Sequence, residues 1–359
     1  PAAGAAPALR LESRVAALYG DSIRALVRAT LARLGAADLD VILEDTGALP
    51  YVLMARVEAA VKRLRPELQA AALPEISAPR APTPRDRLRR SRLYLPGNTP
   101  KFFVNAGLHQ PDAVILDLED SVAAAEKDAA RLLVRNALRA VNFYGAEVTV
   151  RVNARPAGLE DIRVLAGHGV QAFILPKVET AEEILSAAAA AGPVHLIPIL
   201  ESARGVFNAL AIAEASPQVA AVSIGLEDYT ADLGAARTPE GRESLWARSQ
   251  VVNAARAAGV QPLASVYAEV DDLDGMRRFA AEARAFGFEG VACLHPRQVA
   301  AAHAGFRPGP DEVEQARRIV AALAEARAAG QGVVAVDGKM VDAPVALRAQ
   351  RVLRLAEAP

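Results

Sequence analysis

Short apolar runs alternate with longer amphipathic stretches along most of the chain. After residue 90, each run is followed by an alanine-rich segment in which apolar residues recur at helical spacing. Near-continuous apolar strands separated by helices are typical of a parallel sheet covered on both faces. Eight such units in about 210 residues predict an α/β fold, a closed (β/α)8 TIM barrel rather than an open doubly wound sheet. The runs lie at 92–95, 113–116, 148–152, 172–175, 195–199, 221–224, 263–266 and 290–294.

The chain ahead of these units has a different pattern. Within residues 9–65 it predicts helices over 22–31 and 51–64 and a strand near 41–43. Such a small α/β unit buries a modest core, so we expect it either to pack against a neighbouring part of the chain or to have low stability. Residues 66–90 are rich in Pro, Ala and Arg without an apolar period, which predicts a linker stiffened by polyproline geometry.

The chain also continues beyond the eighth unit. Helical patterns over 311–329 and up to Ala356 flank a short strand at 333–336. Because this tail lies outside the eightfold repeat, we expect a helical lid or an oligomerisation arm. The predicted parts are therefore 1–65, 66–90, 91–309 and 310–359.

Charge, hydropathy and cysteine content exclude several classes of protein. There are 41 basic and 42 acidic side chains and no run of eighteen apolar residues, so neither a membrane span nor attraction to nucleic acid is expected. A single cysteine, Cys293, excludes an internal disulfide and a multi-cysteine zinc site. No basic-then-apolar signal opens the chain, and we expect a cytoplasmic protein. Only five of the 41 basic residues are lysines, which gives each lysine some functional weight.

Charged residues follow five of the eight runs, at the strand ends where barrel enzymes place their sites. Helix capping explains any one of these acids. Several carboxylates meeting at one edge would repel each other unless a cation joined them, and hard oxygen ligands without clustered His or Cys indicate Mg²⁺. Because Mg²⁺ keeps several waters, Glu201 and Asp228 on adjacent strands suffice as its protein ligands.

Other charged residues near the same edge have two interpretations each. Glu119 and Asp120 could hold metal-bound water or cap the next helix. Arg151 could bind a substrate carboxylate or a developing enolate, or form a salt bridge to either acid. The turn over 94–101 leads into a helix, where backbone N–H groups and the Lys101 ammonium could bind a phosphate group.

Eight motifs, in consistent order from about residue 90 to residue 355, resemble the citrate lyase beta subunit. This subunit is part of the HpcH/HpaI aldolase and citrate lyase family, which also contains malyl-CoA and citramalyl-CoA lyases. The first 65 residues, notably EDTGAL at 44–49, resemble the citrate lyase gamma subunit, an acyl carrier protein. The eight motifs are RLYLPGN at 92–98, LDLEDSV at 116–122, VRVN at 150–153, LPK at 175–177, ESARG at 201–205, GLEDY at 225–229, HPRQ at 295–298 and GKMVD at 338–342.

The resemblance implies a barrel, usually a homotrimer or a dimer of trimers, with Mg²⁺ on Glu201 and Asp228. It assigns Arg151 to the substrate and the thioester oxygen. It also assigns Tyr94 and Lys101 to the CoA-type chain. A citrate lyase alpha subunit is a further partner that the resemblance implies.

The resemblance also makes Asp342 the catalytic acid, delivered into the site of a neighbouring subunit. The implied reaction is a retro-Claisen cleavage of a citryl thioester to oxaloacetate and an acetyl thioester, in which Asp342 protonates the enolate. Arg151 and the metal would stabilise the developing charge.

The nature of the thioester stays open. Carriers of this family hold a phosphoribosyl dephospho-CoA arm on a serine, and only Ala, Gly and Pro precede Leu9 here. Either the true start lies upstream, or the carrier segment has become structural and free CoA thioesters are the substrates. Ala264, where the family commonly has an acid, and Leu226, where a small residue is usual, leave the acyl group open.

Three alternatives to a citryl thioester lyase therefore remain at this point. The first is a citramalyl-CoA or malyl-CoA lyase that uses free CoA thioesters. The second is a non-catalytic scaffold within a citrate lyase complex, which would not need four converging charged residues. The third is a barrel that handles phosphoenolpyruvate, which gives no reason for Asp342. The run TPEG at 238–241 and the carrier fusion favour citrate lyase.

Overall fold

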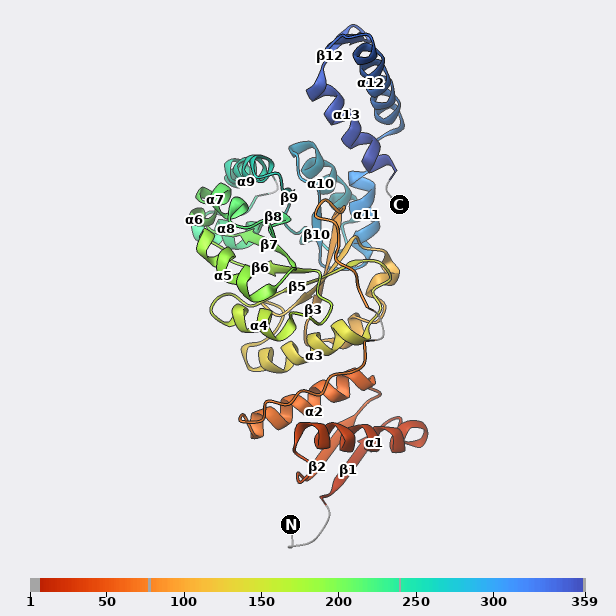
Figure 1. The fold of residues 1–359 in the computed structure, drawn as a ribbon, viewed down its shortest axis with the longest axis vertical. Helices are drawn as coiled ribbons and strands as arrows, with labels where there is room; N and C mark the ends of the chain where they lie inside the picture. The colour runs from red at the N-terminus through yellow and green to blue at the C-terminus, as the bar shows by residue number, and fades with distance from the viewer. Residues whose placement is uncertain (1–6, 77–78, 239, 358–359) are drawn as a thin grey trace.

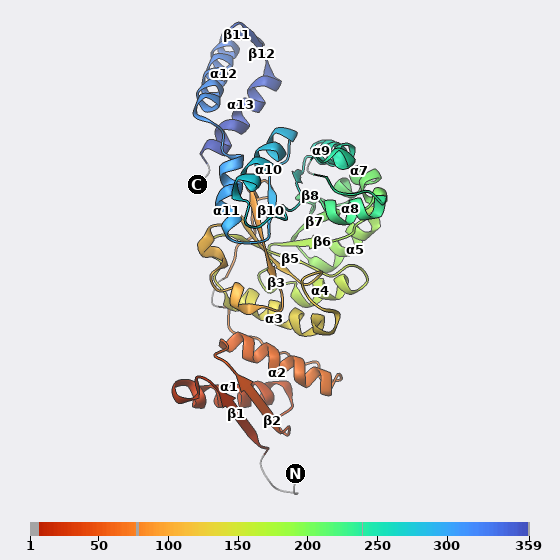
Figure 2. The same ribbon diagram turned by 180° about the vertical axis from the view of Figure 1, so that it is seen from behind.

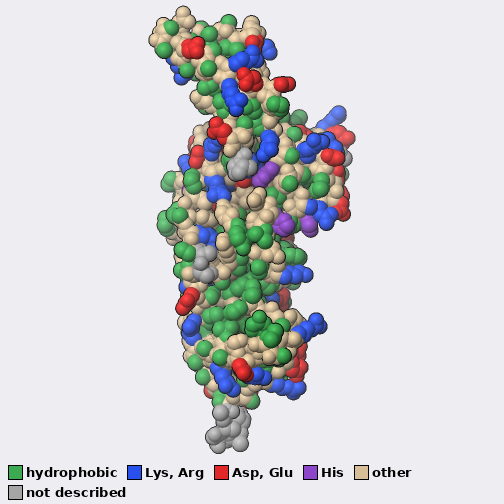
Figure 3. Space-filling model, turned by 90° about the vertical axis from the view of Figure 1, so that its right-hand side faces the viewer, with side chains coloured by type: hydrophobic (Ala, Val, Ile, Leu, Met, Phe, Trp, Pro, Cys, Tyr) green, Lys and Arg blue, Asp and Glu red, His purple; other side chains and the backbone are tan. Residues whose placement is uncertain are grey.

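Three parts of the chain follow one another along the long axis of the molecule (Figure 1). The structure is a computed structural model that describes residues 7–76, 79–238 and 240–357, so the first six residues of the predicted domain 1–65 lie outside it. A small N-terminal α/β unit, a barrel and a C-terminal arm succeed one another, and the view from behind shows the same order (Figure 2). In space-filling form they make one continuous elongated body (Figure 3).

Eight parallel strands form the central barrel, which confirms the predicted fold. They run in the order β10-β3-β4-β5-β6-β7-β8-β9. Backbone hydrogen bonds from Ala264 to Gly290 (2.8 Å) and from Glu289 to Pro262 (2.9 Å) join the segments around β9 and β10, which closes the barrel. The strands are β3 (Ser91–Pro96), β4 (Ala113–Asp117), β5 (Glu147–Arg151), β6 (Ala172–Leu175), β7 (His195–Leu200), β8 (Ala221–Ile224), β9 (Gln261–Leu263) and β10 (Val291–Cys293).

The alanine-rich segments between the strands form helices on the outside of the barrel, as predicted. The α-helices are α3 (Lys127–Ala140), α4 (Ala157–Leu165), α5 (Ala181–Ala191), α6 (Ala203–Phe207), α7 (Ala209–Glu214), α8 (Leu226–Leu233), α9 (Leu245–Ala257), α10 (Leu273–Phe286) and α11 (Arg297–Phe306). Short 3-10 turns are η1 (Pro100–Phe102), η2 (Ala106–His109), η3 (Ala124–Glu126) and η4 (Arg242–Ser244).

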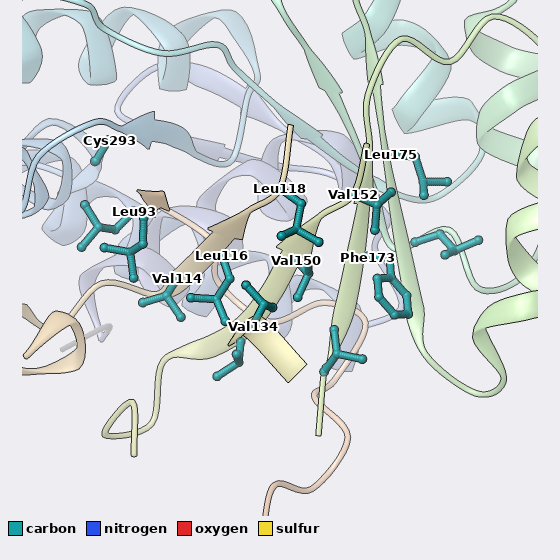
Figure 4. Packing of buried hydrophobic residues seen from close by; sticks show 14 of the residues in the cluster. Leu93, Val114, Leu116, Leu118, Val134, Val150, Val152, Phe173, Leu175 and Cys293 are labelled. Atoms are coloured by element: carbon teal, nitrogen blue, oxygen red, sulfur yellow. The ribbon is translucent and has the colours of Figure 1, made fainter. Parts of the chain in front are cut away.

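The two faces of the barrel strands carry two layers of core. Leu116, Val150 and Phe173 point outwards and pack in one cluster with Val134 of α3 (Figure 4). Because both faces are buried, the strands read as continuous apolar runs. The apolar cluster inside the barrel consists of Ile115, Ala172, Ile174, Ile197, Ile199, Ala221 and Leu263, with Tyr94 packed against it.

The N-terminal unit has one more strand than the sequence predicted. The predicted helices and strand are present, as α1 (Ala16–Leu34), α2 (Pro50–Leu64) and β2 (Val41–Asp45). β1 (Leu9–Ser13) pairs in parallel with β2 and alternates half-buried with exposed residues. A five-residue alternation in front of a helix is a weak signal, and for that reason the strand was missed.

Helix α2 joins the N-terminal unit to the barrel. Leu53 and Val57 pack in the cluster around α1, whereas Val52 and Ala55 belong to the main core around the barrel. Between the two units the buried Glu58 carboxylate accepts hydrogen bonds from both terminal nitrogens of Arg135 on α3, at 3.1 and 2.7 Å. The N-terminal unit therefore shares both apolar and charged contacts with the barrel.

Residues 66–90 contain no helix or strand in their described part, from which residues 77–78 are left out. The end of the segment nevertheless packs tightly under the barrel. The Arg89 guanidinium pairs with Glu147 at 2.7 Å, and both side chains are fully buried. Thr83 donates to the same carboxylate at 2.5 Å. This end of the predicted linker thus forms part of the base of the barrel.

The C-terminal arm projects from the barrel beyond α10 and α11 (Figure 1). It consists of α12 (Pro310–Ala328), a hairpin of β11 (Val334–Val336) and β12 (Lys339–Val341), and α13 (Ala343–Ala356). The predicted helices and the strand at 333–336 are confirmed, and β12 was not predicted. In the part of the chain that the structure describes, no helix is long and apolar enough to cross a membrane.

Candidate active site

A cavity of about 200 Å³ opens at the carboxyl ends of the barrel strands. This is the end at which barrel enzymes hold their substrates. Its walls come from both the barrel interior and the loops that follow the strands. Five of the eight predicted site residues line it: Tyr94, Asp120, Arg151, Glu201 and Asp228.

Glu201 and Asp228, the expected magnesium ligands, lie on neighbouring strand ends in this cavity. Glu201 follows β7 directly and is 5% exposed, and Asp228 is in the first turn of α8 and half-exposed. The Oε2 atom of Glu201 is buried without a hydrogen-bond partner among the described residues. Burial, with the negative charges of Glu119 and Asp228, raises the pKa of Glu201 to about 8. The positive charges of Arg151 and Lys177 lower this pKa but do not outweigh burial and the two neighbouring acids, so a further cation beside Glu201 would stabilise its charged form.

These two residues fit a magnesium ion. The described residues contain no group of three or more His, Cys, Asp or Glu placed to hold a metal. Mg²⁺ does not need one, because it binds through one or two carboxylates and fills its remaining positions with water and substrate oxygens. The orphaned buried oxygen of Glu201, beside the carboxylate of Asp228, supplies such a partial ligand set.

Arg151, the last residue of β5, is held in the cavity wall by acidic side chains. Its Nε and Nη2 donate to the two carboxylate oxygens of Asp117 at 2.7 and 2.8 Å. Its Nη1 lies 2.8 Å from Glu119 and 3.2 Å from Asp120. Burial would raise the pKa of Asp117, but the Arg151 guanidinium outweighs it and holds that pKa below its usual range. The salt-bridge interpretation of Arg151 is thus confirmed, within the cavity wall.

Asp117 is a residue whose role the sequence did not reveal. Its carboxylate accepts hydrogen bonds from the backbone N–H of Glu119 (3.0 Å) and of Ser121 (3.3 Å). It therefore makes the turn contacts that the sequence had allowed for Glu119 and Asp120. Glu119, buried and ion-paired, and Asp120, exposed, instead face Arg151.

Lys177 is a second residue without a predicted role. It follows β6, and its Nζ lies 3.2 Å from Glu119 and 3.6 Å from Asp228. The ammonium thus bridges two of the carboxylates near the cavity. The scarcity of lysine in this arginine-rich chain had given Lys177 functional weight, without indicating a specific role.

Lys101 and Asp342 do not line the cavity within one chain. Lys101 is exposed in η1, after the carboxyl end of β3, with its Nζ 5.0 Å from the centre of the Phe102 ring. Asp342 caps α13 on the arm, where its carboxylate accepts a hydrogen bond from the backbone N–H of Val345 at 3.2 Å.

Comparison with known proteins identifies the family. The family described as HpcH/HpaI aldolase/citrate lyase matches residues 90–296. The citrate lyase subunit beta of Leuconostoc mesenteroides is 38% identical over 286 residues, which cover 76% of this chain and 95% of that protein. The chain belongs to the HpcH/HpaI aldolase/citrate lyase family. This membership confirms the expected class, a carbon–carbon lyase.

Two further similar proteins extend the comparison. Human mitochondrial citramalyl-CoA lyase is 35% identical over 290 residues, covering 75% of this chain and 86% of that protein. A crystal structure of CitE from Mycobacterium tuberculosis, in complex with magnesium, acetoacetate and coenzyme A, superimposes with a TM-score of 0.65 at 33% identity. That comparison covers 77% of this chain and 100% of the CitE chain.

The N-terminal segment matches a carrier-protein family. The family described as malonate decarboxylase delta subunit (MdcD), an ACP, matches residues 1–64. The expected resemblance of this segment to an acyl carrier protein is thus confirmed.

Proposed function

We propose that the chain cleaves a citryl thioester, on CoA or on a carrier arm, to oxaloacetate and an acetyl thioester. The observation that carries this proposal is the buried, unpartnered Glu201 oxygen beside Asp228, in a cavity whose wall also presents Arg151. A reaction that passes through an enolate requires negatively charged ligands for a divalent cation. It also requires a guanidinium that is held in a fixed position.

Glu201 and Asp228 would hold the magnesium ion. When bound, Mg²⁺ polarises the oxygens of a hydroxy acid and fixes their orientation. Glu119 and Asp120 would accept hydrogen bonds from water around the ion, with Lys177 limiting the negative charge on Glu119.

Arg151 would stabilise the charge that develops on the thioester oxygen. Asp117 fixes the orientation of the Arg151 guanidinium by accepting two hydrogen bonds from it. The Cζ atom of Arg151 lies 5.0 Å from the centre of the Tyr94 ring. A donor held in place before the reaction needs no reorganisation when the enolate forms. Lys101 lies exposed near the same end of the barrel, where its ammonium would bind a phosphate group of the CoA-type chain.

Asp342 would supply the proton that completes the reaction. The carbinol proton would pass to water in the cavity as the central C–C bond breaks, and the bonding pair would pass into the thioester enolate. Asp342, in its protonated form, would then give its proton to the enolate carbon and regain one from solvent. Because Asp342 lies on the projecting arm, a second copy of the chain would deliver it, in a trimer or a dimer of trimers (Figure 1). A citrate lyase alpha subunit is the proposed partner of that assembly.

The test offers the full chain three thioesters in parallel with Mg²⁺: citryl-CoA, citramalyl-CoA and malyl-CoA. We expect oxaloacetate to be released from citryl-CoA fastest. The alternative function, citramalyl-CoA lyase, is favoured by the similarity to the human enzyme of that name, and faster release of pyruvate would establish it. Release of no keto acid from any of the three would contradict the lyase proposal.

A further inference from the structure

Arg92 lies on the floor of the active-site cavity. Side chains alternate along β3, so that Leu93 and Leu95 join the outer core while Tyr94 packs inside the barrel. Arg92 shares the inward face with Tyr94 and lines the same cavity. It is 2% exposed and precedes Tyr94 by two residues, so it lies one layer deeper below the carboxyl ends of the strands.

The Arg92 guanidinium has few hydrogen bonds for a buried group. Its Nη2 donates to the backbone oxygen of Ala264 at 2.5 Å, and its Nη1 reaches the hydroxyl of Ser223 at 3.4 Å. Its Nε has no hydrogen-bond partner among the described residues. A guanidinium carries five N–H donors, so part of its donor capacity is unused beside the cavity.

Arg92 also differs from the other buried arginines of the described chain. Arg89 pairs with Glu147 at 2.7 Å, Arg90 with Asp112 at 2.9 Å and Arg135 with Glu58 at 2.7 Å, whereas no ion pair links Arg92 to a described carboxylate. Burial lowers the pKa of Arg92 to about 10, which leaves the guanidinium charged at neutral pH. Burying a charge without its counterion is costly, so the fold keeps a cation on the cavity floor at the expense of stability.

We propose that Arg92 binds a second carboxylate of the substrate and thereby selects dicarboxylic over monocarboxylic keto-acid units. This inference rests on the proposed function and specifies its substrate class. A citryl thioester carries a carboxymethyl group at the carbon where a citramalyl thioester carries a methyl group. With the hydroxyl and first carboxylate held near Glu201 and Asp228, the second carboxylate points to the floor. There Arg92 and the Ser223 hydroxyl donate to it.

The test measures binding of two keto acids, oxaloacetate and pyruvate, to the full chain by calorimetry in the presence of Mg²⁺. We expect Arg92→Met to weaken oxaloacetate binding by about 10- to 100-fold, the usual range for a charged hydrogen bond. Pyruvate binding should change by less than about 3-fold, because pyruvate has no second carboxylate to lose a partner. Arg92→Lys should recover part of the loss, and Arg277→Met, an exposed arginine on α10, is the matched control.

Two results would overturn the role of Arg92. One is equal weakening of oxaloacetate and pyruvate in Arg92→Met, and the other is a wild-type chain that binds pyruvate as tightly as oxaloacetate. If Arg92→Met fails to fold, the wild-type comparison and the Arg92→Lys titration decide the question.

The outcome is separable from that of the proposed function. A chain that binds oxaloacetate through Arg92 but cleaves no thioester would refute the lyase proposal alone. A chain that cleaves citryl-CoA with an unchanged KM in Arg92→Met would refute the role of Arg92 alone.

Discussion

The Glu201 carboxylate lies directly against the backbone of Gly225. A Cβ atom on residue 225 would be 2.7 Å from Cγ and 2.8 Å from Oε1 of Glu201, closer than side-chain carbons approach. Gly225 has a φ of −107°, which any residue adopts, so the glycine is required by this contact and not by its backbone conformation. The start of α8 thus supplies Asp228 in the first turn, while its N-cap Gly225 packs against Glu201.

Gly225→Ala should therefore damage the metal site while leaving the fold intact. The new methyl group would displace Glu201, and we expect Mg²⁺ affinity to fall by about 10- to 100-fold, as when a positioning contact of a metal ligand is lost. Calorimetric Mg²⁺ titration measures this. Gly332→Ala is the control, because a Cβ there meets nothing within 4 Å. Unchanged Mg²⁺ affinity in Gly225→Ala would contradict the assignment of Glu201.

Asp117→Asn should lower turnover more than it weakens substrate binding. The amide cannot give Arg151 the two-point carboxylate contact, and a displaced guanidinium stabilises the enolate less well. We expect kcat for citryl-CoA to fall by about 100-fold with a smaller change in KM. Steady-state kinetics, with thermal unfolding as the control for stability, provides the measurement. If the variant also unfolds at a temperature low enough to account for the lower kcat, the role of Asp117 is structural only.

Asp342→Ala and Arg151→Ala should complement each other in mixed oligomers. Each variant alone should be at least about 100-fold less active, because each lacks one group that acts on the enolate. If the arm serves a neighbouring copy, mixed oligomers contain some sites with both residues intact. Activity after co-refolding, with mixed assembly verified by mass, tests this expectation. Verified mixed oligomers without recovered activity would place Asp342 outside the shared site.

The contact between Glu58 and Arg135 should make stability depend on pH. Burial would raise the pKa of Glu58, but the Arg135 guanidinium and the N–H of Ala72 outweigh burial and lower it below its usual 4.5. This carboxylate therefore stabilises the fold above pH 4.5, and its contribution is lost as the pH falls through the lowered value. Urea unfolding should show this loss between pH 7 and pH 3.

Glu58→Gln should remove most of that pH dependence. At pH 7 we expect a loss of about 3 kcal/mol in the free energy of unfolding, because Arg135 would keep a buried charge without its partner. Glu44→Gln, at an exposed position in β2, is the control and should behave like the wild type. A pH profile identical in wild type and Glu58→Gln would disprove the role of this ion pair.

Much of the fold could be predicted because burial on both faces leaves continuous apolar runs. The runs at 113–116 and 172–175 coincide with the cores of β4 and β6. The short strands β1 and β12 lack that signal, since each is partly exposed and only three to five residues long.

The site could be predicted less completely than the fold. Glu201 and Asp228 follow strands, so their meeting at one end of the barrel follows from topology alone. The roles of Asp117 and Arg92 depend on contacts between strands. Asp117 on β4 contacts Arg151 on the neighbouring strand β5, and Arg92 on β3 contacts Ser223 on β8 and Ala264 after β9. Spacing along the sequence does not reveal that Arg151 forms an ion pair with a carboxylate, whereas Arg92 forms none with a described residue.

The most direct test of the account is one set of Mg²⁺ titrations on the full chain, read both by calorimetry and by release of oxaloacetate from citryl-CoA. We predict that Glu201→Gln and Asp228→Asn each lose Mg²⁺ binding and at least about 100-fold in turnover. Glu227→Gln, beside Asp228 but paired with Arg237, should keep both. Full Mg²⁺-dependent turnover in Glu201→Gln or Asp228→Asn would contradict the central claim that these two carboxylates hold the metal.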